Sequence, residues 1–252
     1  MPLIMNMRNS LFAVLVAVLM VGGCTSLGQV KIKKPEPLTP EILASEKTGW
    51  WSARFRINWP PDTKASWQVD LLLAHQVILP VLERHKSEIA LWRVHRRAVR
   101  DSSGHRFSFI FYAPQSAAYT IFQELMNDSL LSQLKYSGLV IEDSYDDPAV
   151  VSKPDIEDTS DTHWSVIVQK NWPYYVMGAS QMWLNMIVHV AGELSDGNEF
   201  YSIAEIEAFY QEVNTRLIEI WQTEGRHAYL HHLNALFGYK PLIYYDRRYL
   251  SF

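Results

Sequence analysis

The pattern of hydrophobic and polar residues changes just after Trp50, which marks the start of the folded part of the chain. From Trp51 to Asn58, apolar and polar side chains alternate, which is the period-two pattern of a strand with one buried face. Residues 66–85 instead carry apolar side chains at helical spacing, and Pro80 is expected to kink this helix or split it in two. The pattern therefore predicts a strand followed by a crossing helix.

The strand pattern and the helix pattern both recur further along the chain. The predicted elements are a strand at Glu88–Arg100, a hairpin at Asp101–Gly104, a strand at His105–Ala113, a helix that opens at Pro114–Gln115 with a break near Asp128, and a short strand at Leu139–Ile141. The order over residues 50–143 is then β-α-β-β-α-β. This order is typical of the split βαβ, or ferredoxin-like, arrangement, in which a four-stranded antiparallel sheet carries both helices on one face. The predicted fold class is α+β, with a helical C-terminal region.

The C-terminal part of the chain is predicted to be mainly helical. The expected elements are an extra strand at Trp164–Gln169, a very apolar helix at about Pro173–Leu194, a long helix from Ser202, a further helix between Gly225 and Gly238, and a final strand at Ile243–Tyr245. Ser202 and Glu205 match a capping box, which favours a helix start there. The long helix has one apolar stripe, formed by Ile203, Ile206, Phe209, Val213, Leu217 and Ile220.

Composition supports a packed domain and narrows the classes of function. Hydrophobic residues make up 48% of the chain and aromatic residues 13%, which excludes disorder for most of it. The formal net charge of −4 argues against nucleic acid as a partner. The nine tryptophans are candidates for stacking on sugar rings, but aromatic residues at strand and helix spacing are more often part of a core.

The N-terminus has the layout of a secretory signal. Arg8 lies in a short polar start, an apolar stretch runs from Leu11 to Val21, and the small pair Gly22-Gly23 follows. The apolar stretch is too short to span a bilayer. Cleavage after Gly23 would leave Cys24, the single cysteine of the chain, as the first residue of a mature chain of 229 residues with a net charge of −5.

The segment Val21-Gly22-Gly23-Cys24 resembles the lipobox of bacterial lipoproteins. The resemblance covers residues 1–24 and implies that the Cys24 thiol is diacylated before cleavage and its amine is acylated afterwards, with fatty acids such as palmitate. Thr25 and Ser26 lack the aspartate that retains enterobacterial lipoproteins at the inner membrane, so the resemblance implies the outer membrane, facing the periplasm. The alternative is an ordinary signal peptide that contains a cysteine.

The chain is expected to have five parts. They are a signal peptide (1–23), the acylated Cys24 with a Pro/Lys-rich tether (24–47), the ferredoxin-like region (48–145), an acidic linker (146–163) and the mainly helical region (164–252). The tether is either an extended spacer or a basic segment that rests on anionic headgroups. Residues 142–161 hold eight acidic residues against Lys153, which is typical of a solvent-exposed connector.

The first candidate site is the sheet face that points away from the predicted helices. Alternation places six basic side chains on this face: Arg54, Arg56, Arg93, His95, Arg97 and Arg106. Guanidinium groups bind carboxylates and phosphates through two oxygens at once, so this face suits an anionic partner. The alternative is that the acidic connector or the C-terminal helices cover the face and pair with it.

Two further groups of polar residues lie on predicted helices. Gln181, Asn185 and His189, followed by Glu193, are spaced four apart and form a polar stripe that lines a cavity or faces solvent. If this helix crossed a bilayer, the polar side chains would lie in the hydrocarbon core, which is unfavourable in free energy. His227 and His231 are one helical turn apart, with His232 adjacent and Glu224 before them, and form a weak metal candidate. Ala228 stands where a zincin has its glutamate, so no metal site is expected.

The function expected from the sequence is that of a non-catalytic envelope lipoprotein. The chain would be held on the membrane by its N-terminal lipid and would bind an envelope protein or an anionic glycan, with no cofactor and no nucleic acid. The sequence has no nucleophile elbow, phosphate loop, paired-carboxylate motif or Cys/His dyad. The alternative is a periplasm-facing hydrolase, or another enzyme of cell-envelope polymers, because catalytic groups meet in space rather than in sequence.

Overall fold

Strand β1 (Thr48–Ile57) is the element that the alternating segment after Trp50 predicts. The computed structural model describes residues 47–195 and 200–241, and within them β1 pairs with two other strands. Its apolar side chains from Trp51 to Ile57 are at most 1% exposed, whereas Arg54 and Arg56 on the other face are half-buried. The alternation therefore sorts the side chains of the strand between two faces, as predicted.

Four strands of the described residues form one antiparallel sheet. The other three are β2 (Leu91–Ala98), β3 (His105–Pro114) and β4 (Val140–Tyr145), and the order across the sheet is β2-β3-β1-β4. The predicted α+β class and antiparallel sheet are thus present. β4 is longer than the short strand predicted at 139–141 and includes the start of the acidic segment.

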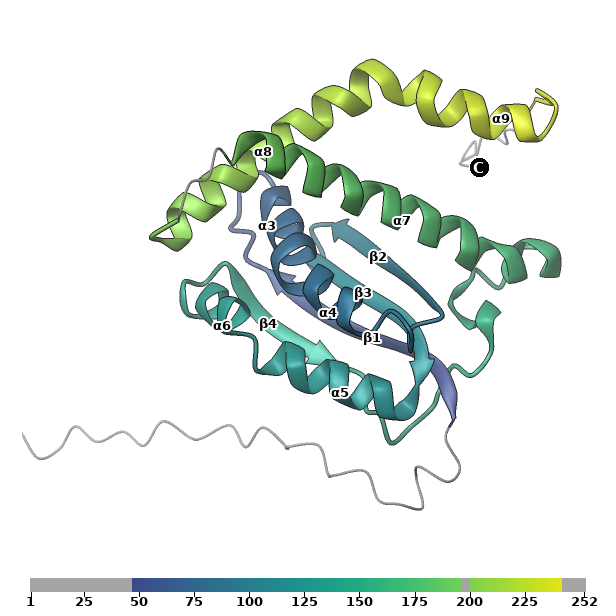
Figure 1. The fold of residues 1–252 in the computed structure, drawn as a ribbon, viewed down its shortest axis with the longest axis horizontal. Helices are drawn as coiled ribbons and strands as arrows, with labels where there is room; N and C mark the ends of the chain where they lie inside the picture. Colours follow the sequence, from purple (N-terminus) through teal and green to yellow (C-terminus); the bar gives the residue numbers. More distant parts are fainter. Residues whose placement is uncertain (1–46, 196–199, 242–252) are drawn as a thin grey trace, which may run out of the picture. The chain divides into compact units, whose positions relative to one another are not determined.

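Helices that follow β1 and β3 cover one face of this sheet (Figure 1). The first is continuous, although it has three parts: α3 (Trp67–Leu72), the π-helical turn η1 (Leu73–Ile78) and α4 (Leu79–Arg84). Pro80 does not split it. A proline has no N–H and its ring would clash with the carbonyl four residues earlier, and the wider turn just before Pro80 relieves that conflict.

The helical connection between β3 and β4 is interrupted near Asp128, as the sequence predicts. Helix α5 (Gln115–Met126) ends just before Asp128, and α6 (Ser129–Tyr136) begins after it. The Asp128 Oδ1 accepts a hydrogen bond from the Leu131 backbone N–H at 2.7 Å, so Asp128 is the N-cap of α6. Gly138 has a φ of 77° and turns the chain into β4.

Helix α7 (Val166–Leu194) corrects one prediction. Residues 164–169 were predicted to form a strand, but the helix begins at Val166, with Ser165 as its N-cap. A short apolar run has no periodicity that separates strand from helix. Pro173 lies inside α7 and cannot donate to the Gln169 carbonyl, and the Ser160 hydroxyl donates to that carbonyl instead, at 2.7 Å.

Helices α7 and α8 extend the core beyond the sheet. α7 runs along the edge strand β2, where the Val94 backbone N–H donates to the Ser180 hydroxyl at 3.2 Å (Figure 1). This contact covers an edge that would otherwise expose unpaired backbone groups. Leu184 and Ile187 of α7 belong to the same buried cluster as the sheet residues.

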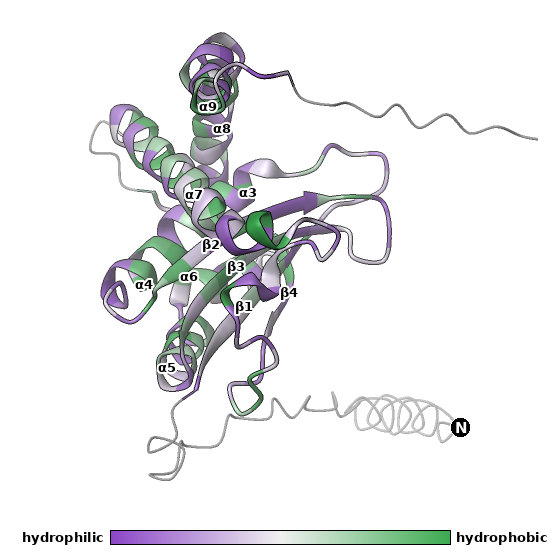
Figure 2. Cartoon of the chain, turned by 90° about the vertical axis from the view of Figure 1, so that its right-hand side faces the viewer, coloured by the Kyte–Doolittle hydropathy of each residue, from purple (hydrophilic) through white to green (hydrophobic). Residues whose placement is uncertain are grey.

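Helix α8 (Ile203–Gly225) confirms the predicted capping box and apolar stripe. The Glu205 N–H donates to the Ser202 hydroxyl and the Ser202 N–H to the Glu205 carboxylate. The stripe packs on the core, mainly against α3. A π-helical turn, η3 (Arg226–His231), and α9 (His232–Leu236) follow. Figure 2 shows that these helices carry hydrophobic and hydrophilic residues side by side, as helices with one buried face do.

Several predicted segments lie outside the described residues. They are the signal peptide, the tether up to residue 46, and the final strand at 243–245.

Tyr210 fastens α8 to the π-helical turn η1. Its hydroxyl donates to Nδ1 of His75 at 2.8 Å and accepts from Nε2 of Gln76 at 2.8 Å. Burial lowers the pKa of His75, so its Nδ1 is available as an acceptor, and burial raises the pKa of Tyr210 to about 12. The wide turn before Pro80 thus presents two adjacent polar side chains to a single tyrosine.

Replacing Tyr210 by Phe should lower the free energy of unfolding by about 1 kcal/mol, because it removes two hydrogen bonds and leaves His75 without its donor. Urea unfolding monitored by circular dichroism measures the change. Tyr201→Phe is the matched control, since the Tyr201 side chain is exposed and should tolerate the loss of its hydroxyl. Equal stability of the two variants would contradict the assigned role of Tyr210.

Candidate functional site: the basic face of the sheet

The strand register brings all six predicted basic residues to the same face of the sheet. Arg106 lies between Arg97 of β2 and Arg56 of β1, as their direct cross-strand neighbour. In the next row, Ser108 lies between His95 and Arg54. Directly opposite residues share a face. The grouping predicted from alternation is therefore present in the structure.

One end of this face is covered by the acidic connector. The Trp50 indole N–H donates to the carbonyls of Asp155 and Ile156, and the Tyr112 hydroxyl donates to the Pro154 carbonyl at 2.6 Å. The side chains of the connector are mostly exposed, as its composition predicts, but its backbone lies against the strands. Part of the face is thus closed by the chain itself.

Two of the predicted arginines are engaged by these covering elements. Arg54 donates to Oδ1 of Asp146 at 2.8 Å. Arg93 lies over the ring of Trp172 in α7, 4.9 Å from the ring centroid, and burial lowers its pKa. The alternative in which the connector and the C-terminal helices cover the basic face therefore holds for this end of the sheet.

The opposite end carries what we term the three-arginine row: Arg97, Arg106 and Arg56, side by side on three strands. Arg97 pairs with Asp101 in the β2–β3 hairpin, and this guanidinium holds the pKa of the Asp101 carboxyl below its usual range. Arg56 lies 3.9 Å from Glu142, which is an ion pair but too long for a hydrogen bond. Arg106, in the middle, has no hydrogen bond or ion pair with any described residue.

The three-arginine row places like charges side by side, and the ion pairs of Arg97 and Arg56 compensate only part of this repulsion. Like charges directly opposite each other across strands destabilise a sheet. His95, the next basic residue on β2, has a lowered pKa because of burial and the positive charges of Arg93 and Arg97. The row is therefore the part of the basic face that is best suited to receive negative charge from a partner.

Arg96 belongs to the other face and forms a buried site that the sequence analysis missed. Its Nε donates to Oδ2 of Asp70 at 2.8 Å, and Nε2 of His105 lies 3.1 Å from Oδ1. Asp70 is fully buried and His105 is 1% exposed. A signal was available, because Asp70 is an acid within the buried stretch Val69–Ala74, and such an acid needs a cationic partner.

A pocket of about 340 Å³ opens beside the three-arginine row. It lies between the loop after β1 and the β2–β3 hairpin. Its lining includes Arg56, Asn58, Trp59, Arg100 and His105, together with Asp101, whose carboxylate is paired with Arg97. Arg56 therefore belongs to both the row and the pocket. No motif indicated this pocket in advance, because its residues come from segments far apart in sequence.

The remaining predicted candidates do not join this site. Gln181, Asn185 and His189 are exposed on α7, and Nε2 of Gln181 donates to Oδ1 of Asn185 at 2.8 Å, so the stripe faces solvent.

The histidines His227, His231 and His232 have ring centroids 5.1 to 5.7 Å apart, since the π-helical turn η3 brings the third ring beside the other two. In the described part of the chain, no three potential ligands are arranged to hold a metal ion.

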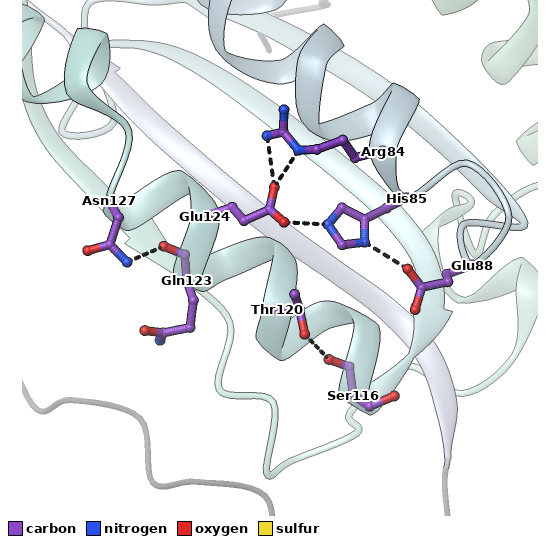
Figure 3. Close-up of polar contacts among 8 residues, drawn as sticks. All are labelled: Arg84, His85, Glu88, Ser116, Thr120, Gln123, Glu124 and Asn127. Atoms are coloured by element: carbon purple, nitrogen blue, oxygen red, sulfur yellow. Dashed lines mark hydrogen bonds and ion pairs between the residues drawn. The ribbon is translucent and has the colours of Figure 1, made fainter.

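A cluster of charged side chains that no sequence motif indicated connects α4 to α5 (Figure 3). His85 is 7% exposed and lies between two carboxylates: Nδ1 is 2.7 Å from Glu88 and Nε2 is 2.9 Å from Glu124. Arg84 donates to the other oxygen of Glu124 through Nε and a terminal nitrogen. Burial by itself would lower the pKa of His85, but the hydrogen bonds and charges of the two glutamates outweigh it and raise that pKa.

The raised pKa of His85 predicts a stability that depends on pH. The folded state binds the proton more tightly than the unfolded state, whose histidine has a pKa of about 6.5. The contribution of His85 should be fully present below that pH and should be lost as the pH rises through the folded-state pKa. The measurement is the free energy of unfolding of the native protein and of His85→Gln between pH 5.5 and 9.

The native protein should therefore exceed His85→Gln in stability by more at pH 5.5 than at pH 9. His189→Gln is the matched control, because His189 is exposed on α7 and its side chain has no hydrogen bond or ion pair with the described residues. A difference that stays constant or grows with pH would contradict the assignment.

No protein-family model, no curated protein and no solved structure matches this chain. Among the described residues, none of the helices is both long enough and apolar enough to cross a membrane.

Proposed function

We propose that this chain is a lipid-anchored component of the bacterial cell envelope that binds an anionic partner through the three-arginine row. The observation that carries the proposal is Arg106, which lies between two other arginines and has no neutralising partner among the described residues. Guanidinium groups in a row present paired donors to carboxylate or phosphate oxygens. An acidic face of an envelope protein or an anionic glycan would supply these oxygens.

The anchor is the second part of the proposal. The charged start, the apolar stretch, the small pair and Cys24 support a lipoprotein signal, and Thr25-Ser26 supports the outer membrane, facing the periplasm. An acylated N-terminus would hold the domain at the membrane surface, where phosphorylated and carboxylated polymers are the expected partners. The lipid and the basic face then have separate roles, one in location and one in recognition.

We infer a ferredoxin-like arrangement for residues 48–145, because the strand order β2-β3-β1-β4 and the helices after β1 and β3 agree with a split βαβ topology. In this arrangement one sheet face is left without helices of its own. That face carries the arginines, and its end with the three-arginine row is the one that the connector and α7 do not cover.

A second candidate function is an enzyme of envelope polymers, and one observation favours it. His105 contacts the carboxylate of Asp70 and also lines the pocket, which is the pairing that orients a general base. However, the His105 side chain is fully covered, and a general base must reach the proton that it removes. Binding without catalysis is therefore the better supported function.

The Cys24→Ser variant tests the anchor. Without a thiol to acylate, the protein should be recovered in the aqueous phase of a detergent partition or retain its signal peptide, whereas the native protein enters the detergent phase. Ser26→Ala, two residues away, is the control, since it leaves the cysteine intact. Unchanged partitioning of the Cys24 variant would contradict the lipid anchor.

The Arg106→Ala variant tests the row. The purified mature chain should bind a dextran sulfate column, and the variant should elute at a clearly lower salt concentration because the central charge is gone. Its melting temperature should stay unchanged or rise, since a like-charge contact is relieved.

Arg54→Ala provides the contrast for this test, because Arg54 is already paired with Asp146. It should reduce stability more than Arg106→Ala and reduce retention less. Equal retention of the native chain and Arg106→Ala would exclude the row as the binding surface.

A further inference from the structure

The pocket beside the three-arginine row has walls that the protein holds in place. Arg100 of the hairpin donates to the carbonyls of Trp59, Pro60 and Thr63, all at 2.9 to 3.0 Å, and lies 3.5 Å from the centroid of the Trp59 ring. The Trp59 indole N–H donates to the Thr63 carbonyl. The loop after β1 and the β2–β3 hairpin are thus connected, and a preorganised wall reduces the entropy lost on binding.

Two side chains of the pocket have hydrogen-bonding capacity that the described residues leave unused. Arg56 has only the 3.9 Å contact with Glu142, so its guanidinium is free to donate to an anionic oxygen. Asn58 is exposed, and its side-chain amide has no hydrogen bond with any described residue. An amide both donates and accepts, which suits hydroxyl groups.

His105 forms a covered side of the pocket. Its Nε2 lies within 3.2 Å of both oxygens of Asp70, so this nitrogen donates to the carboxylate. Nδ1 is buried and has no partner among the described residues. Because this side chain is fully covered, the polar contacts of a ligand in the pocket fall to Arg56 and Asn58.

We infer that this pocket binds one sugar unit that carries a single anionic group, a carboxylate or a phosphate. The anionic group would contact Arg56, the hydroxyls would face Asn58, and the Trp59 ring would supply an apolar wall. The volume of about 340 Å³ is within the range of small-ligand pockets. The inference rests on the proposed function, since it makes an acidic glycan the partner of the adjacent row.

The test uses the mature chain and four probes: glucuronate, glucose 6-phosphate, glucose and inorganic phosphate. Binding is followed by titration calorimetry and by tryptophan fluorescence. At least one acidic sugar should bind at least about tenfold more tightly than both glucose and phosphate, which corresponds to about 1.4 kcal/mol. Whichever of glucuronate and glucose 6-phosphate binds more tightly identifies whether the anionic group is a carboxylate or a phosphate. Equal binding of phosphate and glucose 6-phosphate would overturn the inference, because the site would then recognise a bare anion.

Asn58→Ala and Arg56→Ala locate the site. Each should weaken binding of the acidic sugar by about tenfold or more, and Arg216→Ala, which replaces an exposed arginine of α8, should not. Asn58 is exposed, so its variant is expected to fold, and melting temperatures check both pocket variants. Unchanged sugar affinity in a folded Asn58→Ala protein would exclude this pocket.

Retention on dextran sulfate separates this inference from the proposed function. If Arg106→Ala lowers retention while the four probes bind alike, only the sugar pocket is wrong. If an acidic sugar binds selectively while retention does not depend on Arg106, the pocket stands and the three-arginine row is wrong.

Discussion

The buried carboxylate of Asp70 is the interaction on which the arrangement of the sheet and its helices depends. It is fully covered, and a buried charge is tolerated only when it is paired and hydrogen-bonded. Arg96 and His105 supply those contacts from β2 and β3, and the Arg96 guanidinium also lies 4.9 Å from the ring centroids of Trp67 and Trp183. A single acidic side chain thus joins the first helix, two strands and α7.

This contact also determines what the other face of the sheet carries. Because Arg96 points toward Asp70, alternation along β2 directs Arg93, His95 and Arg97 to the opposite side. A shift of one residue would place Arg96 on the basic face and bury its neighbours. The register that satisfies a buried charge is therefore the register that assembles the three-arginine row.

Much of the fold could be predicted from local pattern, whereas the site could be predicted only in part. The alternation of β1, the cap at Asp128 and the capping box at Ser202 are local signals, and the structure confirms them. The strand predicted at 164–169 was wrong, because a short apolar run fits two kinds of structure and the helix start at Ser165 decided between them. The six basic residues share a face as predicted, but the groups that contact Arg54, Arg56 and Arg93 lie far away in sequence.

The sequence by itself determined which side chains share a face, because the periods of strands and helices are properties of the local backbone. It also carries the case for a lipid anchor at Cys24, which depends on a linear motif. Tertiary structure alone decided what surrounds Arg54, Arg93 and Arg106. Asp146 reaches Arg54 and Trp172 covers Arg93, but Arg106 meets only like charge across the strands. Charge compensation depends on distances in space, so no reading of neighbouring residues could have distinguished Arg54, which pairs with Asp146, from Arg106, which has no ion pair among the described residues.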